Sequence, residues 1–191
     1  MYNLNENVNS EGGSIKIFPL GVTDNVTLTD VVTDVANNGN SYLKFVFTAD
    51  DSSEVSHFEW PLDSDSENFN SKLLNQTKRI KHILTKFIKK DFPQAKSFED
   101  LANKIVAIFS KMKGYEKIAL RLKTVYNYNN YIAVPKYVPF IERMDVSPTK
   151  LTITNFDKME KEAADNPAAI SNNSQPTLNK EEKEEIETLP F

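Results

Sequence analysis

Apolar and polar residues alternate along three stretches in the first third of the chain, at residues 22–35, 42–48 and 54–60. Alternation with a period of two is typical of β-strands that bury one face. Residues 37–40 read Asn-Asn-Gly-Asn and residues 50–53 read Asp-Asp-Ser-Ser. These residue types favour tight turns because they tolerate positive φ or hydrogen-bond their own backbone. The pattern therefore predicts three successive antiparallel strands joined by short turns.

The period changes to that of an amphipathic helix at about residues 68–90 and again at residues 97–113. The polar residues 63–67 precede the first helix and could supply its N-cap. Ser97-Phe-Glu-Asp100 opens the second helix as a loose capping box, because Asp stands where Glu is preferred. Gly114 ends that helix. Two helices therefore follow the three strands.

Strand patterns return at residues 118–126 and 131–134, with a turn at 128–130 between them. Residues 135–140 are rich in Pro and aromatic side chains, and residues 151–154 could add a last short strand. The whole chain is thus mainly β with a helical insertion, an α+β fold. Five or six strands that close on themselves, with about two helices between the third and fourth, form an OB-type antiparallel β-barrel. A sandwich with a helical insert fits the same pattern.

The chain divides into a folded body and two polar ends. Residues 1–13 are Asn-rich and end in Gly-Gly, which predicts a flexible arm. We expect the OB-type domain at residues 14–156, with its helical segment at 68–113. Residues 157–191 lack an apolar stripe, which predicts a disordered linker and an acidic tip.

Charge is segregated along the chain, although the net charge is only −4. Residues 1–66 carry 2 basic and 11 acidic side chains, whereas residues 67–143 carry 16 basic and 6 acidic ones. Residues 157–191 return to an excess of acid, 9 against 4. A basic middle between acidic flanks is compatible with nucleic-acid binding, which depends on the local patch.

Composition excludes several classes of protein. The chain has no cysteine and two histidines, which excludes disulfides, Cys-based zinc sites and cysteine nucleophiles. No stretch approaches the roughly 20 apolar residues of a membrane span, and the N-terminus lacks the pattern of a signal peptide. We expect a cytoplasmic protein with no cofactor, no metal and no membrane partner. No phosphate-binding loop or catalytic motif is visible, so we expect no enzyme.

Three motifs resemble phage-encoded single-stranded-DNA-binding (SSB-like) proteins. The first is Asn37-Asn-Gly-Asn-Ser-Tyr-Leu-Lys-Phe-Val-Phe47, and the second runs from Ile118-Ala-Leu-Arg-Leu-Lys123 to Tyr131-Ile-Ala-Val-Pro-Lys-Tyr-Val-Pro-Phe-Ile141. The third is the acidic end that closes on Leu-Pro-Phe. The resemblance implies an OB fold and sequence-tolerant binding of single-stranded DNA in phage DNA replication, recombination or repair, in the cytoplasm of the host cell. It also implies that the tip recruits replication or recombination proteins through Glu184, Glu185, Glu187, Leu189, Pro190 and Phe191.

Single-strand binding needs cations for the phosphates and flat side chains on which bases stack. The candidates are Tyr42, Lys44, Trp60, Lys78, Arg79, Arg121, Lys123, Tyr126, Tyr128, Tyr131, Lys136 and Tyr137. Phe45, Phe47 and Phe58 are expected in the core, and the helix lysines could equally form a solvated face. The alternative function is that of a non-enzymatic phage structural or adaptor protein that works through protein contacts. The unpaired strand edges of an OB barrel would allow a homo-oligomer.

Overall fold

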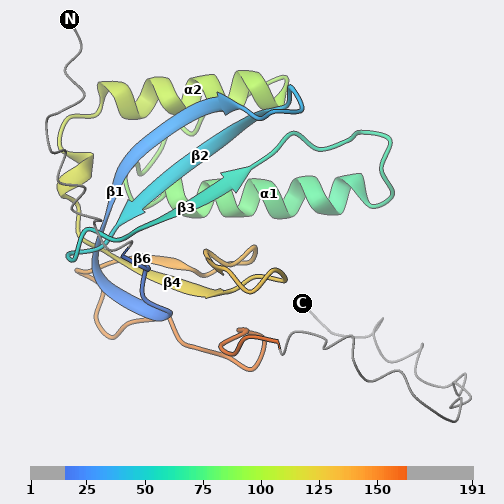
Figure 1. Ribbon diagram of the computed structural model, residues 1–191. Helices are drawn as coiled ribbons and strands as arrows, with labels where there is room; N and C mark the ends of the chain where they lie inside the picture. Colours follow the sequence, from blue (N-terminus) through green and yellow to red (C-terminus); the bar gives the residue numbers. More distant parts are fainter. Residues whose placement is uncertain (1–15, 163–191) are drawn as a thin grey trace, which may run out of the picture. The chain divides into compact units, whose positions relative to one another are not determined.

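The computed structural model describes residues 16–162 of the chain, and its first part is an antiparallel meander (Figure 1). The strands are β1 (Gly21–Val35), β2 (Ser41–Thr48) and β3 (Glu54–Glu59). Two tight turns join them, closed by Gly39 N–H donating to the Ala36 carbonyl at 2.8 Å and Ser52 N–H donating to the Ala49 carbonyl at 2.9 Å. The three strands and both turns are therefore confirmed.

Strand β1 joins the two parts of the sheet because it is 15 residues long. Its second half, from Thr27, pairs with β2, whereas its first half pairs with β4 (Leu120–Tyr126). The register shifts between Thr23 and Val26 in the pairing with β4, around Asn25 whose φ is 57°, and between Leu28 and Asp30 in the pairing with β2. A bulge of this kind bends and twists a strand, so β1 can serve two partners that point in different directions.

The described residues form an open antiparallel sheet of six strands with two helices, a mixed α+β fold. The strand order is β3-β2-β1-β4-β5, where β5 is the short strand Ile132–Ala133. Strand β6 (Ile141–Arg143) pairs with the start of β4, at residues 120–122, whereas β5 pairs with the end of β4, at Val125 and Tyr126. Every pairing is antiparallel.

Both helices lie over one face of β1–β3 (Figure 1). They are α1 (Phe69–Leu84) and α2 (Phe98–Lys111), and a short 3₁₀ turn, η1 (Tyr115–Lys117), leads back to the sheet. Ser97 caps α2 as expected, since its Oγ accepts the Asp100 N–H at 3.1 Å. The Asp100 carboxylate accepts the N–H of Lys96, one residue earlier than in a standard capping box.

The core lies between the helices and the inner face of the sheet. Leu43, Phe45 and Phe47 of β2 are fully buried, as the alternation predicted. They belong to one continuous cluster with residues from both helices and from β4 and β6: Ile80, Ile83, Ala102, Ile105, Phe109, Leu120, Leu122 and Ile141. The helices therefore supply one wall of the core, which is why an insertion between β3 and β4 is part of the folded body.

Four features of the secondary structure differ from the sequence expectation. Helix α1 ends at Leu84 and not near residue 90, because the chain turns there with Lys86 and Phe87 N–H donating to the Ile83 and Leu84 carbonyls. No side chain from residues 63–67 caps α1, whose N-cap is Asn68. Strand β6 was not predicted, and residues 151–154 form no strand.

The packed part of the chain extends past residue 156, because Asp157 is buried. The predicted arm at 1–13 and the acidic tip, Glu184 to Phe191, lie outside the described residues.

Candidate nucleic-acid interface

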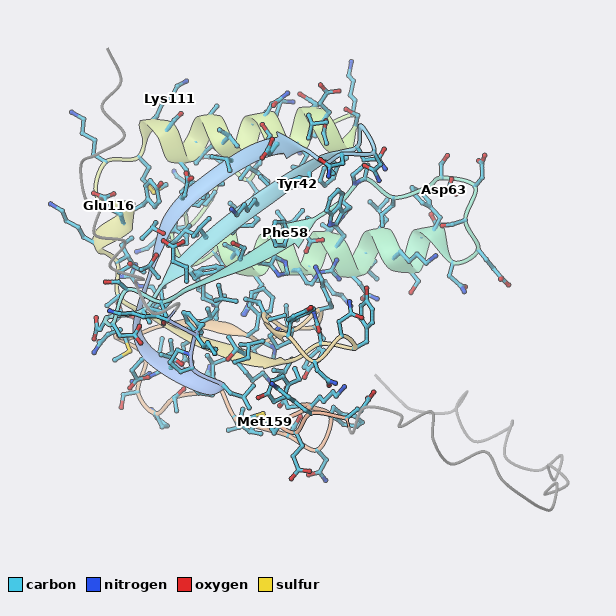
Figure 2. All side chains as sticks on the ribbon, viewed as in Figure 1. Tyr42, Phe58, Asp63, Lys111, Glu116 and Met159 are labelled. Carbon is cyan, nitrogen blue, oxygen red and sulfur yellow. The ribbon has the colours of Figure 1, made fainter. Side chains whose placement is uncertain are left out.

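Three aromatic side chains form a cluster on the outer face of the meander, opposite the helices. We call Tyr42, Phe58 and Trp60 the aromatic platform. The Tyr42 ring lies 4.7 Å from Trp60 and 5.5 Å from Phe58, centroid to centroid. Lys44 pairs with Phe58 across the two strands, and its Nζ lies 6.0 Å from the Phe58 ring. Figure 2 shows Tyr42 and Phe58 side by side on this face, so β2 and β3 together present flat rings and a cation.

The platform is accessible from solvent. Trp60 is 39% exposed, and Tyr42 and Phe58 are half-buried against their neighbours. The Tyr42 hydroxyl donates to Asp34 Oδ2 at 3.1 Å, which fixes its ring on the β1 side of the cluster. Rings that are held in place and partly exposed can accept a further flat group by stacking.

Phe58 corrects an expectation from the sequence, which assigned it to the core. Along β3 the buried residues are Val55, His57 and Glu59, so Phe58 faces outward. The inward face of β3 can be polar because Glu59 meets Gln76 and Arg79 of α1, and His57 bonds to Glu59. The β2–β3 pairing could have indicated the outward position of Phe58. His57 pairs with Phe45 and Glu59 pairs with Leu43, and because Phe45 and Leu43 are core residues, His57 and Glu59 face inward as well.

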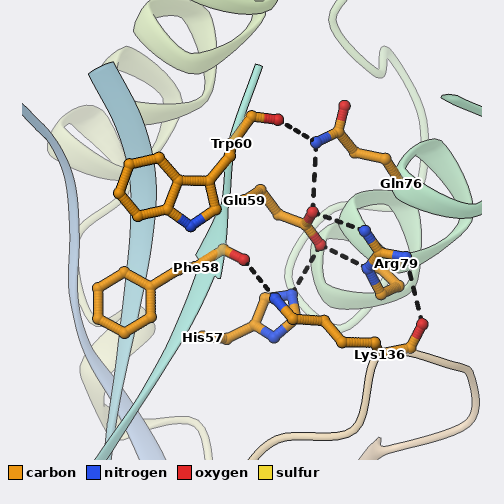
Figure 3. Close-up of polar contacts among 7 residues, drawn as sticks. All are labelled: His57, Phe58, Glu59, Trp60, Gln76, Arg79 and Lys136. Carbon is orange, nitrogen blue, oxygen red and sulfur yellow. Dashed lines mark hydrogen bonds and ion pairs between the residues drawn. The ribbon is translucent and has the colours of Figure 1, made fainter. Parts of the chain in front are cut away.

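A buried polar network supports the platform from beneath (Figure 3). Arg79 of α1 forms a two-point ion pair with Glu59, with Nε 2.7 Å from Oε1 and Nη2 2.8 Å from Oε2. Gln76 donates to the Trp60 carbonyl at 2.7 Å and to Glu59 Oε2 at 3.3 Å. Burial alone would raise the pKa of Glu59, but hydrogen bonds from Arg79 and His57 outweigh it and hold the pKa at about 2. The backbone of β3 and Trp60 is thereby tied to α1.

His57 completes this network from the same face of β3. Its Nε2 lies 2.8 Å from Glu59 Oε1, and its Nδ1 is buried with no hydrogen-bond partner. Burial lowers the pKa of His57, against the favourable effect of Glu59. A neutral ring that donates from Nε2 to Glu59 leaves Nδ1 as an unprotonated acceptor, which costs less than a buried charge without a partner.

Lys136 connects the segment after β5 to the outer edge of β3. Its Nζ donates to the Phe58 carbonyl at 2.6 Å, and its own carbonyl accepts from Arg79 Nη1 at 3.2 Å (Figure 3). Lys44 and Lys136 are therefore the predicted cations that lie beside the platform. The acidic Asp34 lies on the opposite, β1 side, so phosphates would be favoured along the β3 side.

Arg121 and Lys123 do not join this surface. Lys123 is only 2% exposed, and its Nζ lies 3.0 Å from the Asp157 carboxylate. Arg121 pairs with Asp24 at 3.0 Å and with Glu142 at 3.4 Å. These side chains compensate internal carboxylates, so in this arrangement Lys123 is not available to a phosphate. The strand was expected to bury one face only, but residues 122–125 of β4 are all buried.

Tyr137 belongs to the cluster around Lys123. Its hydroxyl donates to the Asp157 carboxylate, and its ring lies 5.1 Å from Lys123 Nζ. Burial alone would raise the pKa of Asp157, but hydrogen bonds from Tyr137, Thr154 and Lys123 lower it to about 2. Tyr137 is therefore held by an internal partner, apart from the platform.

The β4–β5 hairpin presents two further tyrosines. Tyr128 is 83% exposed and Tyr131 is 70% exposed, at the tip of the turn. The Asn127 side chain fixes this turn by accepting the N–H groups of Asn129 and Tyr131 at 2.9 and 3.0 Å. Tyr126 precedes the turn and is half-buried below Lys161, whose Nζ lies 5.7 Å from its ring. We call Tyr128 and Tyr131 the hairpin tyrosines.

The two predicted cations on α1 differ in their surroundings. Arg79 is 13% exposed and forms an ion pair with Glu59, whereas Lys78 is exposed. The structure thus brings together Tyr42, Lys44, Trp60 and Lys136 from the predicted set, and adds Phe58.

Within residues 16–162, no group of three or more His, Asp or Glu side chains is arranged to hold a metal ion, and no helix is long and apolar enough to cross a membrane. The chain matches no model of a known protein family, and a search of curated proteins finds no similar sequence.

Proposed function

We propose that the protein binds single-stranded DNA without sequence preference, as a non-enzymatic factor in phage DNA replication, recombination or repair. The observation that carries the proposal is the aromatic platform, three adjacent rings on an exposed sheet face with Lys44 beside them. Every base has a flat face, so stacking tolerates any sequence. Lys44 and Lys136 would take the neighbouring phosphates.

An OB-type barrel is the fold that we propose for this body. Two observations support it: the order β3-β2-β1-β4-β5, and the approach of β3 and β5 residues within 8 Å between Cα atoms. The bond from Lys136 Nζ to the Phe58 carbonyl further links the two edges. OB folds bind oligonucleotides on strands 2 and 3 and on the loops between strands 1 and 2 and between strands 4 and 5. The platform on β2 and β3 and the hairpin tyrosines between β4 and β5 are consistent with this proposal.

The expected affinity follows from stacking and phosphate contacts. Each base–aromatic stack is worth roughly 1–3 kcal/mol, so two or three stacks with a few charge contacts would give micromolar or tighter binding. Because each phosphate contact releases counterions, the affinity should fall as the salt concentration rises.

The acidic end of the chain enters the proposal on its sequence alone, since residues 184–191 lie outside the described part. We propose that Leu189, Pro190 and Phe191, with the acidic residues before them, recruit replication or recombination proteins in the cytoplasm of the host cell. An apolar side chain beside a terminal carboxylate suits an apolar pocket with basic residues at its rim.

Fluorescence anisotropy of a fluorescein-labelled dT oligonucleotide, titrated with the full chain at several salt concentrations, tests the proposal. We expect saturable binding that weakens with salt, together with much weaker binding to a duplex of the same length. A dC oligonucleotide should bind within a few-fold of dT. Absence of binding to any single strand at low salt would contradict the proposal and favour an adaptor role.

A further inference from the structure

Exposed lysines gather on the solvent side of α1, near its C-terminal end, and in the loop that follows the helix. Lys78 and Lys81 are exposed and stand three residues apart, so they share one face of the helix. The buried residues of this half of α1, such as Ile80 and Ile83, pack into the core. We call the exposed set the lysine surface: Lys78, Lys81, Lys89 and Lys90.

The loop after α1 keeps its two lysines close to the helix. Its first turn is closed by backbone hydrogen bonds to the last residues of the helix. The chain then returns toward α1, because Lys81 Nζ lies 5.5 Å from the Phe92 ring. Lys89 and Lys90 are exposed between these two contacts. The end of α1 and its loop therefore present the four lysines as one patch.

The positive charge of this patch is not compensated locally. No carboxylate in the described part of the chain forms an ion pair with any of the four lysines. Helix α1 contains no Asp or Glu, and Asp91 is the one acidic residue along the chain between Glu67 and Glu99. Four lysines thus stand against a single carboxylate.

Acidic side chains elsewhere on the helical side are distant or face other elements. Segment 63–67 is acidic but precedes α1, and Lys78 lies nine residues into the helix, about 14 Å along its axis. That distance exceeds the Debye length of about 8 Å at physiological ionic strength. Glu99 lines a small pocket with Asp34 beside the end of β1, and Asp100 forms an ion pair one turn along α2. None of these groups screens the lysine surface.

The part of α1 that adjoins β6 is also short of negative charge. Arg143 donates from Nη1 to the Lys86 carbonyl at 3.2 Å and forms its ion pair with Asp145. Burial lowers the pKa of Lys86, and the positive charge of Lys150 adds to this against the attraction of Glu142. Glu142 is itself buried and already in an ion pair. An anion bound nearby would offset the repulsion between these lysines.

The lysine surface offers charge but no ring on which a base could stack. No aromatic side chain of residues 69–96 is exposed, and the exposed large apolar residues of that range are Leu73 and Leu74. A DNA duplex keeps its bases inside and presents its phosphates outside, with one negative charge per roughly 1.7 Å of axis. Exposed cations without rings suit such a backbone, whereas a single strand would leave its bases unstacked.

We propose that the lysine surface binds the phosphate backbone of duplex DNA without reading its sequence. Each lysine would displace condensed counterions, and their release is the source of the affinity. An acidic protein segment fits less well, because its carboxylates are spaced by other residues and hold fewer counterions.

This surface is separate from the aromatic platform, so the proposal does not rest on single-strand binding. The core lies between α1 and the inner face of the sheet, whereas the platform lies on the outer face of β2 and β3 (Figure 1). Duplex binding should remain much weaker than single-strand binding, because stacking adds to the charge contacts only at the platform. One molecule could hold a single strand and a duplex together.

The test follows the anisotropy of a fluorescein-labelled duplex of about 20 base pairs, titrated with the full chain over a salt series. Lys78→Gln with Lys81→Gln removes two charges from the lysine surface, whereas Lys78→Arg with Lys81→Arg keeps both. Lys104→Gln with Lys161→Gln is the matched control, because it removes two charges outside α1 and its loop. Trp60→Ala tests whether the duplex uses the platform.

We expect the native chain to bind the duplex with a Kd of about 1–100 μM at physiological salt. The slope of log K against log salt should be about −3 to −4, as for four phosphate contacts. The K78Q/K81Q variant should bind at least about tenfold more weakly at low salt, and its slope should be shallower by about 2. The Arg variant, the matched control and W60A should each change the Kd less than about threefold.

Absence of duplex binding by the native chain at low salt would show that the proposal is wrong, whether or not dT binds. An equal loss in the K104Q/K161Q control would show a general effect of net charge, and a loss in W60A would move the duplex to the platform. A labelled peptide of alternating Glu and Ser should bind at least about tenfold more weakly than the duplex. If it binds as tightly, and K78Q/K81Q weakens it, the surface serves acidic proteins instead.

Discussion

Arg79 and Glu59 are joined by two short contacts, Nε to Oε1 at 2.7 Å and Nη2 to Oε2 at 2.8 Å, beneath the Trp60 end of β3. The Glu59 side chain is 2% exposed, so its charge depends on Arg79 for compensation, with a further hydrogen bond to His57. The arginine is thereby a structural link between α1 and β3, although the sequence suggested it as a phosphate contact.

Replacing Arg79 should destabilise the fold far more than replacing its neighbour. Arg79→Ala leaves a buried carboxylate without its main partner, so we expect the free energy of unfolding to fall by about 3–5 kcal/mol. Lys78→Ala, on the exposed side of the same helix, should change it by less than about 0.5 kcal/mol. Urea denaturation followed by circular dichroism measures both. Equal stabilities of the two variants would contradict the structural role of Arg79.

Loss of a platform ring should weaken DNA binding without unfolding the protein. Trp60→Ala and Phe58→Ala each remove one stacking surface, so we expect the Kd for a dT oligonucleotide to rise about 5- to 150-fold, equivalent to roughly 1–3 kcal/mol. Phe156→Ala is the control, because Phe156 is 84% exposed and lies outside the platform. An unchanged Kd for both platform variants would exclude the platform as the stacking site.

Replacing Lys44 should change the salt dependence of DNA binding, whereas replacing Lys123 should not. Lys44→Ala removes one proposed phosphate contact and should lower the slope of log K against log salt by about 1. Lys123→Ala should leave that slope unchanged but destabilise the fold by about 3–5 kcal/mol, because the buried Asp157 would lose the positive charge of Lys123. A lower slope for the Lys123 variant, with its stability intact, would show that Lys123 turns outward to DNA.

Stability should fall as the pH drops from about 6.5 to 4 because of His82. Burial, reinforced by Lys86, lowers the pKa of His82 to about 4, and its Nε2 accepts the Phe140 and Ile141 N–H groups at 3.3 and 3.4 Å. In this range the unfolded chain takes up a proton that the folded chain does not, so acid favours unfolding.

His82→Gln keeps a hydrogen-bond acceptor but cannot be protonated, so its urea midpoint should vary less between pH 6.5 and 4 than that of the native chain. Part of the dependence should remain, because burial also lowers the pKa of His57. Below pH 4.5 both proteins should lose further stability. The pKa values of Glu59 and Asp157 are about 2 in the folded chain, so the unfolded chain takes up protons there at a higher pH than the folded chain does. Identical pH profiles of native chain and variant above pH 4.5 would contradict the assignment to His82.

Local patterns predicted the elements that depend on local physics. The strands of the meander follow from alternation and from turn residues such as Gly39, which adopts a positive φ of 82°. The start of α2 follows from Ser97. Strand β6 was missed because Ile141–Arg143 has too few residues for a period to show, and its strand state depends on pairing with β4.

The candidate site was only partly predictable because burial of polar side chains is a tertiary property. Trp60 could be proposed as a stacking side chain, but the sequence favours a core position for Phe58 because most aromatic side chains of a small barrel are buried. Its outward position depends on Glu59 and Arg79 meeting across 20 residues of sequence. Likewise, Lys123 is buried because Asp157, 34 residues later, returns to compensate it.

The most direct test of the central claim uses the fluorescence of Trp60, the only tryptophan in the chain. A dT oligonucleotide is added to the full chain at low salt, and the titration is repeated at high salt while anisotropy follows the DNA. If bases stack on the platform, the tryptophan emission should be quenched in parallel with binding, and salt should restore it. If the DNA binds while the emission stays constant, the platform is not the interface; if neither signal changes, the protein does not bind single strands.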